Sequence, residues 1–145
     1  MKSIVSIEKI RELLPQKAPF QMVSHLFKYE ETGITTGLTI DENNIFVEDD
    51  FFNESGMIEN IAQSIALHIG YRYFLLDIEA PVGYIGSVSR VVLHDRPKIN
   101  DFITTEIEVI KEFMGITLIE GKILCDDKVI MTAQMKTFLS QDPPL

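Results

Sequence analysis

The chain has 145 residues, a length that fits one domain able to bury roughly 70% of the surface that its unfolded form exposes. Its 13 basic and 22 acidic side chains give a net charge of −9, which excludes a basic face for sequence-independent nucleic-acid binding. The single cysteine, Cys125, excludes an internal disulfide and a multi-cysteine metal site. The charged N-terminus does not fit a signal peptide, and no stretch reaches 18 uncharged apolar residues. We therefore expect a cytoplasmic protein without a membrane span.

The first part of the chain predicts one short helix and two strands. Residues 6–14 carry apolar side chains on one helical face, with Ser6 as the expected N-cap and Pro15 as the stop. Residues 21–29 and 33–40 are rich in β-branched or apolar residues and are bounded by glycine or charged turns, a pattern typical of strands.

Residues 55–76 predict the one long helix of the chain, with Ser55 as its expected N-cap. Its apolar side chains occupy more than half of the helix circumference, which indicates a buried helix. These side chains are Met57, Ile58, Ile61, Ala62, Ile65, Ala66, Ile69 and Tyr73.

The remaining sequence changes to a period of two, which predicts consecutive antiparallel strands. The expected strands are residues 82–94, 101–112, 115–125 and 128–139, with turns at 113–115 and 126–127. One buried helix and these strands favour an α+β domain in which an antiparallel sheet wraps around the helix. The tail, residues 141–145, contains two prolines and is expected to be flexible.

Glu59 is the first candidate for chemistry, because it lies one turn inside the predicted buried helix, beside Ile58 and Ile61. A carboxyl group among apolar neighbours is suited to general acid–base catalysis. Gln63 lies four residues further on, at the same helix edge, and could orient Glu59 or a substrate oxygen. A solvated helix edge, or a carboxylate satisfied at a subunit interface, is the structural alternative.

The other reactive side chains give weaker signals. His25, His68 and His94 show no metal-binding spacing, and His68 lies too far along the helix to pair with Glu59 of the same chain. Cys125 is followed by two aspartates, which disfavour its thiolate and hence its use as a nucleophile. We therefore expect no metal and no cofactor.

Three segments, in order, resemble one family. Residues 14–23 (LPQKAPFQMV) resemble the L-P-H-x-x-P-F-x-x-V segment of the β-hydroxyacyl-acyl-carrier-protein dehydratases of hot-dog fold. Residues 58–63 (IENIAQ) are similar to their I-E-x-x-A-Q helix signature, and residues 96–101 (RPKIND) to their R-P-V-x-P-G-D turn. The resemblance implies a hot-dog fold for the single domain 1–145, with one long buried helix wrapped by an antiparallel sheet.

The resemblance also implies a dimer, joined sheet to sheet, that binds an acyl thioester of acyl carrier protein or CoA at the subunit interface. Glu59 and Gln63 match the family's catalytic positions. The residues that would line the site are Gln16, Phe20, Phe52, Gly56, Met57 and Ile61. The loop before the helix is shorter than in the family, so the amide of Gly56 or Met57 is the nearest substitute for the family's oxyanion donor.

In these dehydratases a histidine of one subunit removes the α-proton, and the glutamate of the other helps the hydroxyl group to leave. This sequence has Gln16 at the histidine position, and a carboxamide cannot accept a proton at neutral pH. Three functions therefore stay open: an altered dehydratase, a thioesterase that uses Glu59, and a non-catalytic partner of an active hot-dog dehydratase. The dimer could be a homodimer or a heterodimer with another hot-dog protein.

Overall fold

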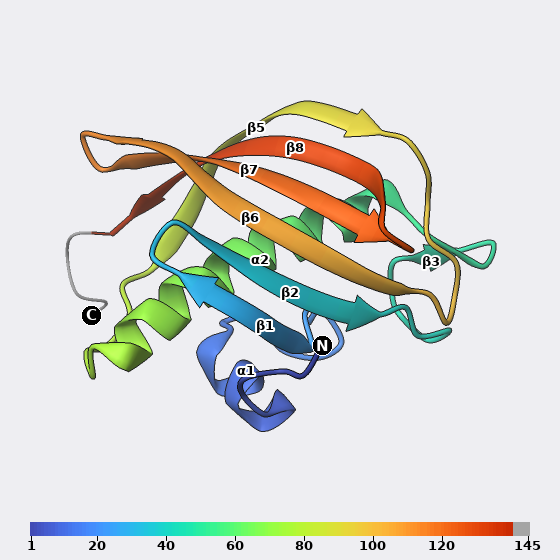
Figure 1. The fold of residues 1–145 in the computed structure, drawn as a ribbon, viewed down its shortest axis with the longest axis horizontal. Coiled ribbons are helices and arrows are strands. Elements are labelled where there is room, and N and C mark those ends of the chain that lie inside the picture. Colours follow the sequence, from blue (N-terminus) through green and yellow to red (C-terminus); the bar gives the residue numbers. More distant parts are fainter. Residues whose placement is uncertain (141–145) are drawn as a thin grey trace.

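The structure, a computed structural model, describes residues 1–140. A six-stranded antiparallel sheet curves around one long helix, and a short helix packs beside it (Figure 1). This arrangement confirms the predicted α+β architecture. The tail at 141–145 lies outside the described residues. Within the described part, no helix is long and apolar enough to cross a membrane.

Two helices and eight strands make up the described chain. In sequence order they are α1 (Ile7–Leu13), β1 (His25–Glu30), β2 (Gly33–Thr39), β3 (Val47–Glu48), β4 (Phe51–Phe52), α2 (Glu54–Leu75), β5 (Gly83–Leu93), β6 (Phe102–Phe113), β7 (Ile116–Cys125) and β8 (Lys128–Leu139). The short pair β3 and β4 was not predicted, because a two-residue strand is too short to show a period.

The two helices are capped by polar side chains. Ser6 caps α1 as predicted, because its hydroxyl accepts the Lys9 N–H at 3.1 Å. The prediction of Ser55 as the cap of α2 is wrong. Asn53 takes that place, and its side-chain oxygen accepts the Gly56 N–H at 2.9 Å. Both residues are good caps, and the chain uses the earlier one, so the helix gains one residue at its start.

The strand order, β1-β2-β6-β7-β8-β5, corrects the predicted run of consecutive strands. Only β6, β7 and β8 form the expected meander, whereas β5 crosses to the far edge and pairs with β8. Residues 94–101 link β5 to β6, a connection too long for a two-residue hairpin turn, so nothing local requires these strands to pair. Strand β6 pairs instead with β2.

The two meander turns lie where the sequence places them. Met114 and Gly115 join β6 to β7, and Asp126 and Asp127 join β7 to β8. All four residues have positive φ angles, as two-residue type I′ hairpin turns require.

The two sheet edges differ in how well they are covered. At the β1 edge the N-terminal segment contacts the strand, because the Ile4 N–H donates to the Leu26 carbonyl at 2.7 Å and Ser3 bonds the same residue. At the other edge, every residue of β5 except the half-buried Leu93 is exposed. An open apolar edge of this length is a site for pairing with another chain.

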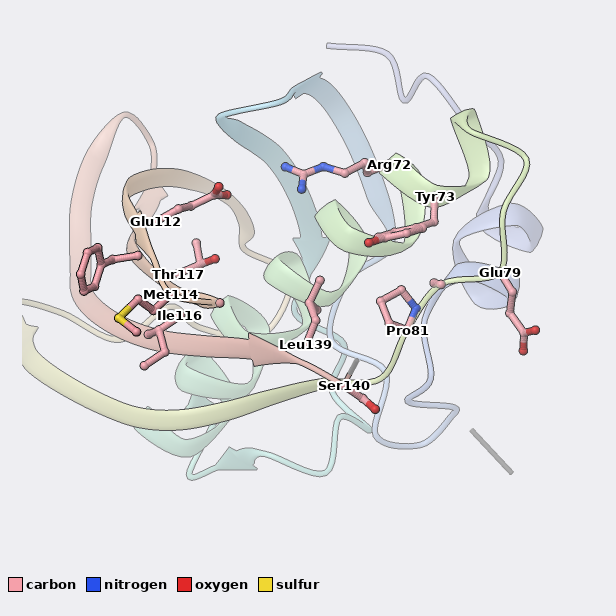
Figure 2. A pocket seen from close by; sticks show the side chains of 13 residues that line it. Arg72, Tyr73, Glu79, Pro81, Glu112, Met114, Ile116, Thr117, Leu139 and Ser140 are labelled. Carbon is pink, nitrogen blue, oxygen red and sulfur yellow. The ribbon is translucent and has the colours of Figure 1, made fainter. Parts of the chain in front are cut away.

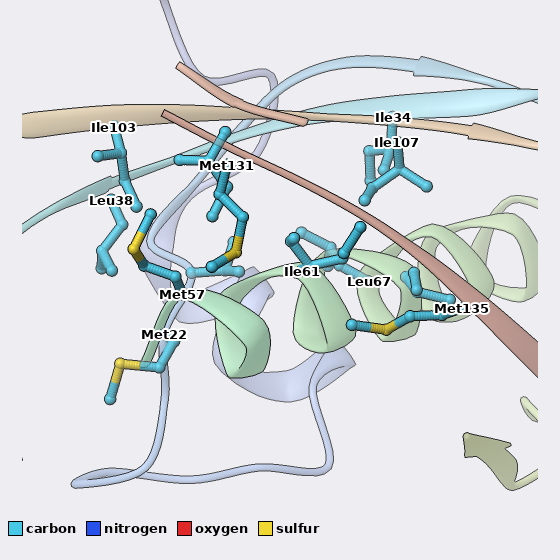
Figure 3. Close-up of a cluster of buried hydrophobic side chains, with 14 of the residues drawn as sticks. Met22, Ile34, Leu38, Met57, Ile61, Leu67, Ile103, Ile107, Met131 and Met135 are labelled. Carbon is cyan, nitrogen blue, oxygen red and sulfur yellow. The ribbon is translucent and has the colours of Figure 1, made fainter. Parts of the chain in front are cut away.

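The core lies between α2 and the sheet. Met57, Ile61 and Leu67 of α2 are fully buried and lie opposite Ile103 and Ile107 of β6 and other sheet residues (Figure 3). The contact between helix and sheet is close at Gly121 of β7, where an added Cβ atom would lie only 2.6 Å from Cγ2 of Ile61. A larger residue at 121 would therefore displace the helix.

His68 attaches the second half of α2 to the β1–β2 hairpin. Its Nε2 lies 2.8 Å from the Glu30 carbonyl oxygen, and its ring packs against Tyr29. The side chain is 4% exposed, and this burial, with the nearby charge of Arg72, lowers the pKa of His68 below its ordinary value of 6.5. The histidine therefore has a structural role in this chain.

Acidification should destabilise the fold through His68. Because its pKa is lower in the folded chain than in the unfolded chain, the unfolded state binds the proton first as the pH falls below about 6.5. The free energy of unfolding should therefore fall more steeply between pH 7 and pH 5 in the native chain than in His68→Gln. Urea unfolding at several pH values measures this difference, and equal slopes would contradict it.

Candidate functional site

The candidate site is built where the chain segment before β1 crosses the first turns of α2. Residues 21–24, predicted as the start of a strand, lie outside β1, which begins at His25. This segment does not join the strand because Met22 uses its N–H and its carbonyl to bond side chains of α2.

Gln63 connects this segment to Glu59. Its Oε1 accepts the Met22 N–H at 2.6 Å, and its Nε2 donates to the Phe20 carbonyl at 2.8 Å and to Glu59 Oε1 at 2.9 Å. Gln63 is fully buried and Glu59 is half-buried. The predicted contact of Gln63 with Glu59 is therefore present, and it holds one carboxylate oxygen of Glu59 in place. The same Gln63 side chain fixes the loop through its bonds to Met22 and Phe20.

Asn60 is a second anchor of the loop and was not among the predicted site residues. Its Nδ2 donates to the Met22 carbonyl at 2.8 Å, and its Oδ1 accepts the Thr105 hydroxyl at 2.5 Å. It is fully buried. A signal was present in the sequence, since an asparagine beside Ile61 on a buried helix needs partners for its amide.

Gln16 lies at the wall of a cavity of about 390 Å³. Residues 12–17 at the end of α1 and in the following loop, one side of α2 and the start of β5 enclose this space. The helix contributes a stripe of small and branched side chains, namely Ala62, Ile65, Ala66 and Ile69. Gln16 therefore lies beside an apolar cavity that Glu59 does not line, and its site-lining role stays a prediction.

Other predicted lining residues lie in the core. Phe52, Met57 and Ile61 have no exposed surface and belong to the cluster between α2 and the sheet. None of them borders the cavity beside Gln16. Because α2 is apolar on both sides, the sequence does not show which stripe faces the sheet and which faces the cavity. Phe20 is 57% exposed and contributes its backbone carbonyl to Gln63.

The expected oxyanion donors at the start of α2 are already engaged. The Gly56 N–H donates to the Asn53 side chain at 2.9 Å, and the Met57 N–H donates to the Asn53 carbonyl at 3.1 Å. This corrects the prediction, because the N-cap that the sequence did not identify occupies both amides. Gly56 has a packing role instead, since an added Cβ would lie 2.5 Å from the Phe52 ring.

A larger cavity, of about 800 Å³, lies between the β6–β7 hairpin and the C-terminal half of α2 (Figure 2). Arg72 and Tyr73 project into it from the helix, and Glu112 and Thr117 line it from the hairpin. Arg72 also donates to the Glu31 carbonyl at 2.9 Å. The cavity is separate from Glu59, which does not line it.

Cys125 should react slowly with alkylating reagents. Burial, followed by the charges of Asp101 and Asp126, raises the pKa of its thiol to about 11. The sequence predicted the influence of Asp126 on the thiol, but it did not show that burial is the main cause of the raised pKa. At pH 8 we expect iodoacetamide to modify Cys125 at least about 100-fold more slowly than an unfolded-chain cysteine. Mass spectrometry of the native and urea-unfolded chain tests this, and equal rates would contradict it.

Comparisons with known proteins identify the family and the fold of the chain. Residues 8–144 match the family described as ApeP-like, ApeP dehydratase. The 3-hydroxyacyl-[acyl-carrier-protein] dehydratase FabZ of Vibrio cholerae is 27% identical over 141 residues, covering 93% of this chain and 92% of the relative. FabZ of Aliivibrio fischeri is 25% identical over 138 residues and covers 91% of each chain.

Solved structures show the same fold. A chain of the dehydratase heterocomplex ApeI:P from Xenorhabdus doucetiae aligns with a TM-score of 0.83 and 15% identity, covering 95% of this chain and 93% of that one. A hypothetical thioesterase of Streptococcus pneumoniae, solved with coenzyme A, aligns with a TM-score of 0.66 and 11% identity, covering 83% and 88%. The chain therefore has the hot-dog fold that the sequence predicts.

Proposed function

Because the chain belongs to the ApeP-like dehydratase family, we propose that it is one subunit of a two-chain dehydratase acting on 3-hydroxyacyl thioesters. In this proposal Glu59 is the catalytic acid, and the base comes from a second hot-dog chain. The observation that carries the proposal is the contrast between Gln63, which holds Glu59 in place at 2.9 Å, and Gln16, a carboxamide at the position of the family's histidine.

Dehydration needs two groups that exchange protons. A base removes the α-proton, the C–O bond to the β-hydroxyl breaks, and an acid protonates the departing oxygen so that water leaves. A protonated Glu59 can supply the second step, but Gln16 cannot accept a proton at neutral pH. His68 of the same chain is buried against the Glu30 carbonyl, so it is not available as the base.

The open edge of the sheet supports a partner chain. Along β5 the large apolar side chains are between 43% and 49% exposed, namely Tyr84, Ile85, Val88, Val91 and Val92. The backbone groups on the outer side of this strand have no neighbouring strand in the described chain. A partner that adds its own strand here would satisfy them and bury the apolar side chains. The similar structure ApeI:P is a dehydratase heterocomplex, which agrees with a partner chain of another kind.

A charge at the centre of β5 should prevent assembly. Val88 is 43% exposed, and Val88→Asp would bury an unpaired carboxylate in the proposed interface, so we expect binding of the partner to weaken about 100-fold. Ile110→Asp is the matched control, because Ile110 is 48% exposed but lies on β6, which β7 and β8 separate from β5. Analytical ultracentrifugation measures how strongly each variant binds the partner chain, and equal effects of the two variants would contradict β5 as the interface.

Turnover of 3-hydroxyacyl thioesters tests the function. The chain is purified alone and together with a hot-dog dehydratase chain from the same genome that carries the Leu-Pro-His motif. Formation of the α,β-unsaturated product and release of free thiol are recorded separately on acyl-carrier-protein and CoA substrates. We expect the unsaturated product, without thiol, from the complex only. Unsaturated product from the chain alone would contradict the two-chain proposal.

A thioesterase is the second candidate. The observation that favours it is that Glu59 is a single positioned carboxylate, which could activate water or attack a thioester without a histidine. Thiol release that disappears in Glu59→Ala would establish this function in place of dehydration. The predicted cytoplasmic location stays a prediction under either function.

A further inference from the structure

Two threonines on the helix-facing side of the sheet bond polar side chains of α2. Thr36 of β2 and Thr105 of β6 are opposite each other on neighbouring strands, and neither has exposed surface. The Thr105 hydroxyl donates to Oδ1 of Asn60 at 2.5 Å. The Thr36 hydroxyl lies 2.8 Å from the hydroxyl of Ser64. A hydroxyl group buried in an apolar core needs such a partner, so the pair restricts how α2 lies on the sheet.

The contact of Thr105 continues to the candidate acid. The Asn60 Nδ2 group donates to the Met22 carbonyl at 2.8 Å. The Met22 N–H donates to Gln63 Oε1 at 2.6 Å, and Gln63 Nε2 donates to Glu59 Oε1 at 2.9 Å. Four consecutive hydrogen bonds therefore connect a hydroxyl group of the sheet with the carboxylate of Glu59.

The contact of Thr36 ends on the helix itself. Ser64 donates its proton to the Asn60 carbonyl at 2.8 Å, so Thr36 is the donor in its bond to Ser64. This branch reaches the backbone of α2 and does not pass through the loop. The two threonines are thus equally buried and each bonds α2 once, but the path to Glu59 begins at Thr105.

We propose that Thr105 is a positioning residue for Glu59 and acts through the amide of Asn60. The role of Glu59 as an acid rests on the proposed function, whereas the path of hydrogen bonds does not. Without the Thr105 hydroxyl, Oδ1 of Asn60 is buried and unpaired, which favours a turned amide. A turned amide no longer donates to the Met22 carbonyl. The loop then shifts, and the Gln63 amide that holds Glu59 shifts with it.

Thr105→Val should lower the kcat of the two-chain complex at least about tenfold, because a misplacement of about 1 Å can cost about 100-fold in rate. The KM should stay within about twofold of the native value, since Thr105 has no exposed surface with which to touch the substrate. Thr105→Ser keeps the hydroxyl group and should restore kcat. Steady-state kinetics with 3-hydroxyacyl-CoA measures these values.

Thr36→Val is the matched control, because it also replaces one fully buried hydroxyl group by a methyl group. Urea unfolding should show a similar loss of stability in both valine variants, whereas Thr36→Val should keep the native kcat. A readout that needs no activity is the NMR signal of the Gln63 side-chain amide in the purified chain. We expect Thr105→Val to displace this signal, and Thr36→Val and Thr105→Ser to leave it in place.

The outcomes separate this inference from the proposed function. A displaced Gln63 signal and a lower kcat in Thr105→Val, both absent in Thr36→Val, support the positioning role. Equal effects of the two valine variants overturn it, because general loosening of α2 would then be the cause. A native Gln63 signal, or a native kcat in an active complex, also overturns it.

Two further results are decisive. If Thr105→Val does not fold, Thr105→Ala removes the same donor, and a native Gln63 signal in that variant overturns the positioning role. If no complex with a partner chain forms the unsaturated product, the proposed function fails. The displacement of the Gln63 signal in the purified chain then supports the path from Thr105, and its absence overturns that path.

Discussion

The Glu59→Gln substitution is expected to lower the dehydration rate of the two-chain complex about 10²–10⁴-fold, the usual contribution of a positioned acid. The carboxamide cannot protonate the departing hydroxyl, but it has the same shape as the carboxyl group. Its oxygen can still accept the Gln63 Nε2–H that Glu59 accepts at 2.9 Å. Folding and assembly should therefore be unchanged, and the loss should appear in kcat.

The control for this variant is Glu108→Gln. Glu108 is exposed on β6 and lies outside the helix that carries Glu59. The Glu108→Gln substitution removes the same negative charge from the chain. It should leave the dehydration rate within about twofold of the native rate, as surface substitutions usually do. Steady-state kinetics with 3-hydroxyacyl-CoA measures both variants. Native activity in Glu59→Gln would exclude Glu59 as the acid.

Replacing Gln63 by Leu should destabilise the folded chain by about 2–4 kcal/mol, because two backbone groups lose their partners. The Met22 N–H, donated to Gln63 Oε1 at 2.6 Å, would be left unpaired in a buried residue. The Phe20 carbonyl would lose the donor at 2.8 Å. The change should also release Glu59 and lower the dehydration rate further than the loss of stability explains.

Urea unfolding measures the stability effect, with Gln134→Leu as the control on the sheet. Gln16→Leu makes a sharper comparison, since it removes an acceptor that has no partner in the described chain. If Gln63→Leu and Gln16→Leu change the free energy of unfolding equally, then the hydrogen bonds of Gln63 do not contribute as described.

Elements with a strong local pattern could be predicted from the sequence. The period of two gives the β6–β7–β8 meander, and the turn residues at 126–127 fix its second hairpin. The sheet order could not be predicted, because no local feature shows that β5 crosses to the edge beside β8. Helix α2 is apolar around most of its surface, so its pattern does not separate the core stripe from the cavity stripe.

The site could be predicted only in part, because the sequence indicates contacts within one helix but not contacts between distant segments. Glu59 and Gln63 are four residues apart on one helix, so their contact follows from the sequence. The partners from the loop do not, because the bonds to Met22 and Phe20 span about forty residues. The engaged amides of Gly56 and Met57 were missed because they depend on which of two polar residues caps the helix.

The central claim is that Glu59 acts with a base from another chain, and a complementation experiment tests it most directly. The partner chain keeps its histidine, and its own helix glutamate is replaced by glutamine, so that Glu59 is the one acid of this type left in the complex. We predict that this complex still forms the α,β-unsaturated thioester, and that Glu59→Gln in the present chain abolishes the remaining activity. Activity that is lost with the partner's glutamate, or that persists after Glu59→Gln, would contradict the claim.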